Sequence, residues 1–212
     1  MGTVELQNNK CVIYSNILLY GNAISEVHRA NIQTEISSMW NEPQATVTIT
    51  GKVYKVSFVI NTWLFAHCTP TDIVENTNPK NNYFRIENTC AINISYVDGL
   101  GSNTGYFFAE NLYAGATTAA HEYGHTLGLP HPSDLNIIGK GVPGIMYPRG
   151  TLVNPEYQYN PAAAPATNGG TLFPKYRKVL QLDIDNLGLN KLQYNNGNAI
   201  LGAFSNVWHG VE

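Results

Sequence analysis

The sequence has little charge and no long apolar run, and each shortage excludes a class of protein. Only 13% of the 212 residues are charged, and the formal net charge of -3 offers no basic surface of the kind that binds nucleic acid. No stretch is long and apolar enough for a membrane-spanning helix. Because 43% of the residues are hydrophobic, the chain can bury a sizeable core. We therefore expect a globular protein with neither nucleic-acid binding nor membrane insertion.

Cysteine is also scarce. Cys11, Cys68 and Cys90 are an odd number, so at most one bridge can form, and none of them belongs to a CxxC pair. This makes a thiolate metal site or a dense disulfide framework a poor expectation. Since a free cysteine behaves as a small apolar residue, we expect ordinary buried thiols.

The first ten residues, MGTVELQNNK, lack the basic start and apolar core of a signal peptide. The composition is nevertheless rich in uncharged hydrogen-bonding residues, which is commoner in proteins outside the cytosol. We expect a secreted or extracellular protein whose export signal has been removed or which uses another route. The sequence leaves the oligomeric state open.

The apolar pattern predicts an α+β protein. Alternating apolar and polar residues indicate strands, and apolar residues recurring at three and four positions indicate helices. Turn-rich polar stretches predict a surface loop at 69–82 and a long irregular region at 130–174. We expect strands at 10–20, 91–97 and 104–109, a hairpin of 45–50 with 52–64 around Gly51, and helices at 24–40, 117–127 and 175–187.

The segment 121–131, HEYGHTLGLPH, has the most specific chemical pattern in the chain. His121 and His125 are four apart on a predicted helix, about 40° from each other around its axis, so their imidazoles can converge on one ion. Gly128 can adopt a left-handed conformation that turns the chain and brings His131 to the same point. A catalytic zinc takes three protein ligands and leaves one position for water. The pattern therefore predicts one zinc ion held by His121, His125 and His131.

Glu122 stands beside a predicted ligand but about 100° around the helix, so its carboxylate can lie next to a metal-bound water. Zinc lowers the pKa of such a water toward ~7, and a nearby carboxylate can take its proton and pass it to a leaving amine. Glu122 is therefore the predicted general base and acid of a peptide hydrolysis. His28, His67 and His209 have no second ligand at a usable spacing, and we expect no metal role for them.

The extended motif HExxHxxGxxH, followed by a Met in a later turn, resembles the metzincin clan of zinc endopeptidases. Residues 144–148, GIMYP, stand where that clan has its Met-turn, and the resemblance implies that Met146 forms a hydrophobic floor under the zinc ligands. Pro132 after the third His is similar to the serralysins, whereas Met146-Tyr147-Pro148 is similar to the matrix metalloproteinases. The serralysins and astacins have a Tyr where Pro148 stands, so the subfamily is mixed.

The same resemblance implies a metzincin-like α+β fold in a single catalytic domain, residues 1–212. Its upper lobe, about residues 1–129, would hold a twisted mixed sheet, a backing helix and the zinc helix. Its lower lobe, about residues 130–212, would be irregular and end in a helix.

For the substrate, the resemblance implies that the strand at 104–109 is the edge of the sheet and pairs with a protein or peptide bound in extended form. The loop after Tyr147 would line the pocket for the side chain that follows the scissile bond. The candidate substrate-binding residues are Tyr106, Phe107, Phe108 and Tyr147.

A zinc-dependent endopeptidase is the function that these residues favour. One alternative is a catalytically silent zinc-binding interaction module, although binding alone would not require Glu122. Another is a toxin or effector protease with one dedicated target, which the sequence does not separate from a general protease. Structural calcium is compatible with the scattered Asp and Asn residues, but no twelve-residue calcium loop is present.

Overall fold

The computed structural model describes residues 1–89, 93–164 and 169–210, and one mixed sheet organises them. Its strands run in the order β3-β4-β2-β5-β7-β6, while β1 pairs with β2 and β8. The fold is therefore α+β, as expected. The strands are β1 Gly2–Gln7, β2 Lys10–Tyr20, β3 Thr46–Ile49, β4 Lys52–Leu64, β5 Asn81–Glu87, β6 Tyr96–Val97, β7 Thr104–Phe108 and β8 Asn198–Leu201, and the helices are α1 Glu26–Asn41, α2 Pro70–Val74, α3 Thr118–Thr126 and α4 Gln181–Asn186.

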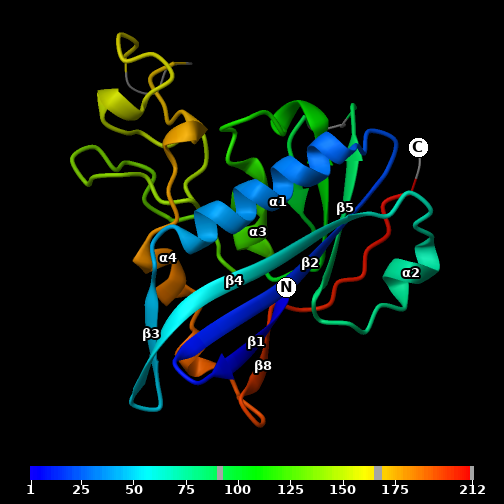
Figure 1. Ribbon diagram of the computed structural model, residues 1–212. Coiled ribbons are helices and arrows are strands. Elements are labelled where there is room, and N and C mark those ends of the chain that lie inside the picture. Colours follow the sequence, from blue (N-terminus) through cyan, green and yellow to red (C-terminus); the bar gives the residue numbers. More distant parts are fainter. Residues whose placement is uncertain (90–92, 165–168, 211–212) are drawn as a thin grey trace.

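Helix α1 lies against the long strand β4, and α3 packs against α1 (Figure 1). Trp40 of α1, Phe58 of β4 and Tyr123 of α3 form an aromatic cluster with ring centroids 5.2 to 6.4 Å apart. The indole of Trp40 donates to the Ala120 carbonyl at 3.0 Å. The hydroxyls of Tyr123 and Ser15 are hydrogen-bonded at 2.8 Å. The helix that carries the HEYGH segment is therefore held by both α1 and the sheet.

Helix α1 forms where the apolar pattern predicts it. Ser25 caps its start by accepting a hydrogen bond from the His28 amide at 3.1 Å. Ile32, Ile36 and Trp40 recur every four residues and are buried against the sheet and α3. The predicted hairpin is also confirmed, since β3 and β4 pair antiparallel around Gly51.

Strand β5 was missed by the sequence prediction, although it lies at the centre of the sheet between β2 and β7. It is polar, yet all but its first residue are buried. Arg85 and Glu87 satisfy each other there, because the Arg85 Nε and Nη2 donate to Glu87 Oε1 at 2.8 and 2.7 Å. The predicted loop at 69–82 was also wrong in part, since it contains α2, whose Pro70 start is capped by Thr69.

The predicted edge strand was wrong. Strand β7 lies between β5 and β6, so the end of the sheet is β6, in which Tyr96 and Val97 pair antiparallel with β7. Of the strand expected at 91–97, residues 96–97 are extended in this way, and residues 91–92 lie outside the described part of the chain. Cys90 lies outside it too. Cys11 is a buried free thiol, whereas the free thiol of Cys68 is only partly buried.

The helix expected at 175–187 is much shorter in the structure. Pro174–Tyr176 form one 3₁₀ turn, and the next residues are extended because the Lys178 amide donates to the Pro143 carbonyl at 3.0 Å. Helix α4 therefore starts only at Gln181. The chain then returns to the sheet as β8, which pairs with β1.

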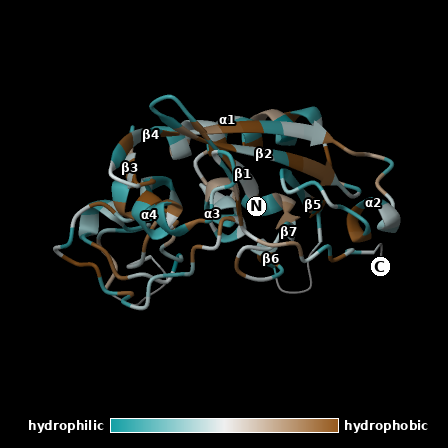
Figure 2. Ribbon diagram, turned by 90° about the horizontal axis from the view of Figure 1, so that it is seen from below, coloured by the Kyte–Doolittle hydropathy of each residue, from teal (hydrophilic) through white to brown (hydrophobic). Residues whose placement is uncertain are grey.

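The irregular segment that follows α3 lies on the side of the molecule away from α2 and the C-terminal end (Figures 1 and 2). Its apolar residues form a small cluster of their own around Ile137, Val153 and Leu172. In the described part of the chain, no helix has the length and apolar character needed to cross a membrane.

Candidate metal centre

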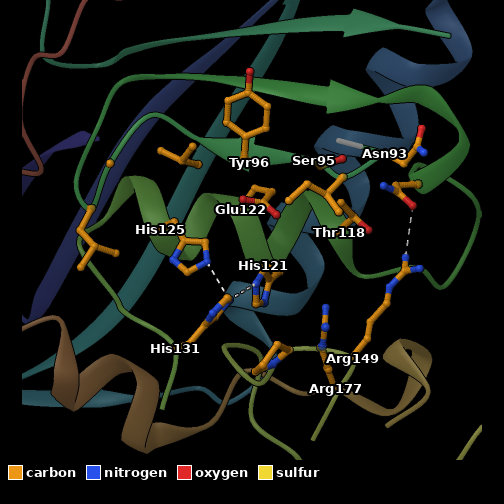
Figure 3. Close-up of a pocket in the computed structure, with 16 residues that line it drawn as sticks. Asn93, Ser95, Tyr96, Thr118, His121, Glu122, His125, His131, Arg149 and Arg177 are labelled. Atoms are coloured by element: carbon orange, nitrogen blue, oxygen red, sulfur yellow. Dashed lines mark hydrogen bonds between the residues drawn. The ribbon is translucent and has the colours of Figure 1, made fainter. Parts of the chain in front are cut away.

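Three histidine side chains converge on one point (Figure 3). The Nε2 atom of His131 lies 3.0 Å from Nε2 of His121 and 3.2 Å from Nε2 of His125. Donors at the corners of a tetrahedron with zinc bonds of about 2.0–2.1 Å would be separated by about 3.3 Å. Two of the three pairs are close to this separation, and all three nitrogens lie within 4.8 Å of one another, so they could hold a single metal ion. Among the described residues, this is the one group of His, Cys, Asp and Glu side chains that could hold one.

Two backbone carbonyls orient the helix histidines. The Nδ1–H of His121 donates to the Ile145 carbonyl at 2.7 Å, and the Nδ1–H of His125 donates to the Leu129 carbonyl at 2.7 Å. A carbonyl can only accept, so each Nδ1 must carry the ring proton. Each Nε2 then presents its lone pair to the common point, which is the tautomer that a metal ligand requires.

Gly128 turns the chain out of α3. Its φ of +96° lies in the left-handed region, as expected from the sequence. The Gly128 amide donates to the His125 carbonyl at 3.0 Å, and the Leu129 amide donates to the Gly124 carbonyl at 3.0 Å. This reversal carries His131 back toward the two helix histidines.

Met146 lies directly against α3, the helix with His121 and His125. Its turn is closed by a hydrogen bond from the Tyr147 amide to the Gly144 carbonyl at 3.2 Å, and its side chain is buried. A Cβ built on Gly124, which stands next to His125, would come within 2.3 Å of the Met146 Sδ. The sulfur therefore occupies the place of a missing side chain on α3.

Asp183 holds the same turn from the other side and was not predicted from the sequence. Its carboxylate accepts a hydrogen bond from the Leu180 amide at 2.8 Å. Burial raises the pKa of Asp183 to about 6, and hydrogen bonds from the Leu180 and Ile145 amides oppose that rise. Thus the Ile145 residue whose carbonyl orients His121 is itself held by Asp183. Nothing in the local sequence marks this contact, because α4 brings Asp183 from far along the chain.

The surroundings of the three imidazoles favour their neutral form, although His131 is exposed. Burial lowers the pKa of His125 to about 4, lowers that of His121 well below its usual range, and lowers that of His131. The positive charge of Arg177 acts in the same direction on all three. Neutral imidazole is the form that binds metal, so no proton has to be displaced from these side chains at neutral pH.

Glu122 faces the same pocket from α3 (Figure 3). Only 6% of its surface is exposed. Burial raises the pKa of its carboxyl to about 8, and the nearby charge of Arg177 opposes that rise. A cation beside it would further favour the ionised form.

The pocket around these residues has a volume of about 530 Å³. None of the four candidate substrate-binding residues lines it: Phe107 is stacked on Phe84 at 4.3 Å inside the core, and the Tyr106 hydroxyl donates to the Thr89 carbonyl. Phe108 and Tyr147 also lie outside the lining. Ser95 and Tyr96 lie on one side of the pocket, and Arg149 and Arg177 lie on the other (Figure 3). Val97 and Pro148 also line it. Pro148 and Arg149 belong to the loop after Tyr147 that was expected to line a pocket, whereas Ser95, Tyr96, Val97 and Arg177 were not identified from the sequence.

Comparison with known proteins adds little to this geometry. No protein-family model matches the chain, and no curated protein matches it in sequence. Among solved structures, that of myroilysin is similar to the chain with a TM-score of 0.39 and 12% identity, over 88% of this chain and 98% of that one. A likeness at this level carries no information about function.

Proposed function

We propose that this protein is a zinc-dependent endopeptidase of metzincin type. The observation that carries the proposal is the meeting, in one pocket, of three neutral imidazole Nε2 atoms and the buried carboxyl of Glu122. The HExxHxxGxxH pattern and the packing of Met146 under the helix support the metzincin assignment.

In the proposed reaction, His121, His125 and His131 hold the ion through Nε2. When bound, zinc supplies a Lewis acid that polarises the scissile carbonyl and makes a water nucleophilic near neutral pH. Glu122 takes the proton of the attacking water as its oxygen bonds to the carbonyl carbon. The same carboxyl then gives that proton to the amine as the C–N bond breaks. A carboxyl whose pKa the pocket raises toward neutrality suits both transfers.

The substrate we propose is a protein or peptide in extended form, lying between β6 and the opposite wall of Pro148 and Arg177. We expect the enzyme to act outside the cytosol, on the basis of its low charge and its wealth of uncharged polar residues. A catalytically silent zinc module is less well supported, because it would have no use for a buried carboxyl at the metal. A protease with one dedicated target remains the variant of the proposal that substrate profiling addresses.

The decisive experiment compares the wild type with Glu122→Gln on an unfolded protein and a mixed peptide library, with the zinc content of each determined. We expect wild-type cleavage, about one zinc per chain in both proteins, and a loss of roughly 10²- to 10⁴-fold or more in kcat/KM for the variant. Zinc retention separates loss of the base from loss of the metal.

A matched control is Glu156→Gln, which removes an exposed carboxylate outside the pocket and should leave both zinc and activity unchanged. Wild-type levels of cleavage by Glu122→Gln would exclude Glu122 as the base. Zinc binding with no cleavage of any substrate by the wild type would remove the general-protease proposal.

A further inference from the structure

Arg177 is a buried cation to which the described residues offer no ion-pair partner. It is 4% exposed, and its Nε is buried with no hydrogen-bond partner. The other buried arginine, Arg85, is fully engaged, with two hydrogen bonds to Glu87 and a third to the His209 carbonyl at 2.8 Å. The contrast matters, because a buried charge is normally paired or strongly unfavourable.

The guanidinium of Arg177 lies in the metal pocket. Its charge lowers the pKa of all three metal-site histidines and of Glu122. Figure 3 shows it approaching from the wall opposite Ser95 and Tyr96, on the same side as Arg149. The charge of Arg149 is also close enough to lower the pKa of Arg177. Two guanidinium groups therefore share one wall of the pocket.

The pocket has more positively charged side chains than negatively charged ones. Among the described lining residues there are two arginines and one carboxylate, Glu122. No ion pair joins Glu122 to either arginine in the described part of the chain. A bound divalent cation held by neutral imidazoles would make the pocket more positive still. The pocket is thus preorganised for an anionic group of the ligand.

We propose that Arg177, supported by Arg149, binds a carboxylate of the substrate next to the scissile bond, so that the enzyme selects acidic peptides. This deepens the proposed function and rests on it. The planar fork of an arginine matches a carboxylate with two parallel N–H···O hydrogen bonds, and the anionic groups of an ordinary peptide are carboxylates. The carboxylate can come from an Asp or Glu side chain or from a free C-terminus, and the test separates the two.

The first measurement is binding, which does not depend on turnover. Zinc-loaded Glu122→Gln protein is titrated with peptide pairs that differ by Glu against Gln at one position at a time, and with peptides ending in a free carboxylate or an amide. We expect one acidic position or a free terminus to raise affinity by about 10- to 100-fold over its neutral isostere. A position inside the peptide identifies a side-chain carboxylate, and a preference for the free end identifies a terminal one.

Adding Arg177→Gln to the same protein should abolish the preference for acidic over neutral peptides without weakening the binding of the neutral ones. Arg177→Lys should restore only part of it, because lysine keeps the charge and loses the fork. Lys175→Gln is the matched control: it removes an exposed positive charge two residues away, outside the pocket, and should leave discrimination intact. Arg149→Gln changes an exposed position and should reduce the preference for acidic peptides. This second test does not depend on whether the variant of the buried Arg177 folds.

Equal binding of acidic and neutral peptides at every position and terminus would overturn the inference. So would discrimination that persists in Arg177→Gln. Neither result affects the proposed function, which is tested separately by wild-type cleavage of an unfolded protein and a mixed peptide library. Conversely, acidic selectivity in binding without any cleavage would support the role of Arg177 and remove the peptidase.

Discussion

At the scale of single residues, Gly124 is the position where a side chain is excluded. Glycine inside a helix is less stable than alanine by about 1 kcal/mol, so its presence in α3 calls for a physical reason. The reason is Met146, whose sulfur would lie 2.3 Å from a Cβ at this position. The indole of Trp40 would also approach to 3.2 Å. The metal-binding helix can approach the Met146 turn only because this residue has no side chain.

Gly124→Ala should therefore destabilise the protein by about 1–3 kcal/mol, the usual range for overpacking, instead of stabilising the helix. Chemical denaturation measures the change, and a zinc titration should show weaker binding, since Met146 would be displaced from its contact with the helix that carries His121 and His125. The same substitution in a Met146→Ala background should be far less harmful, and the double-mutant cycle gives the coupling. Stabilisation by Gly124→Ala alone would mean that the two residues are not packed together.

At the scale of elements, the start of α3 depends on α1. Thr117, at the N-cap, has a left-handed φ of 54° and makes no side-chain capping bond. Glu35 of α1 caps the helix instead. Its carboxylate accepts a hydrogen bond from the Ala120 amide at 3.0 Å. It also accepts hydrogen bonds from the Ala119 and Thr117 amides. A negative charge at a helix N-terminus also suits the helix dipole. The first turn of α3, from which His121 projects, is thus positioned by a residue of another helix.

Glu35→Ala should lower the free energy of unfolding by about 1–2 kcal/mol, as expected for loss of a helix cap, and weaken zinc binding. Thermal unfolding and a competitive zinc titration measure the two effects. Glu26→Ala is the control on the same helix, because the Glu26–Arg29 pair is a surface ion pair worth about 0–1 kcal/mol. Equal zinc affinity in the wild type and Glu35→Ala would show that α1 does not position the site.

At the scale of the whole molecule, the site brings together segments that lie far apart along the chain. Two of the proposed ligands come from α3 and the third follows it. The residues that support them come from the Met146 turn and from α4. The main hydrophobic core packs the sheet against α1 and α3 through apolar side chains, which need no metal in order to pack. The metal should therefore add stability to a fold that already exists.

Removal of zinc by a chelator should lower Tm while leaving a single cooperative transition. Zinc at a thousandfold above its Kd adds about 4 kcal/mol to the folded state. Differential scanning calorimetry with and without chelator measures this. The shift should vanish in His131→Ala and persist in Glu122→Gln. An apo protein without a cooperative unfolding transition would show that the hydrophobic core does not stabilise the fold without zinc.

Much of the local structure was predictable from the sequence. Strand β2, the β3–β4 hairpin and helix α1 were placed correctly, because an apolar period of two or about 3.6 residues records which face of an element is buried. The helix with His121 and His125 and the turn at Gly128 followed from spacing and from the conformational freedom of glycine. These properties belong to neighbouring residues and need no distant partner.

Other features depend on contacts between residues far apart in the sequence, and only the tertiary structure decided them. Strand β5 is polar but central, because Arg85 and Glu87 satisfy each other when buried, and no apolar period reports such a pair. The extended segment before α4 pairs with the backbone near Pro143, so part of a predicted helix was wrong. The same extended segment turns Arg177 into the metal pocket. A side chain enters a site through the path of the whole chain, and that path depends on contacts that local sequence does not contain.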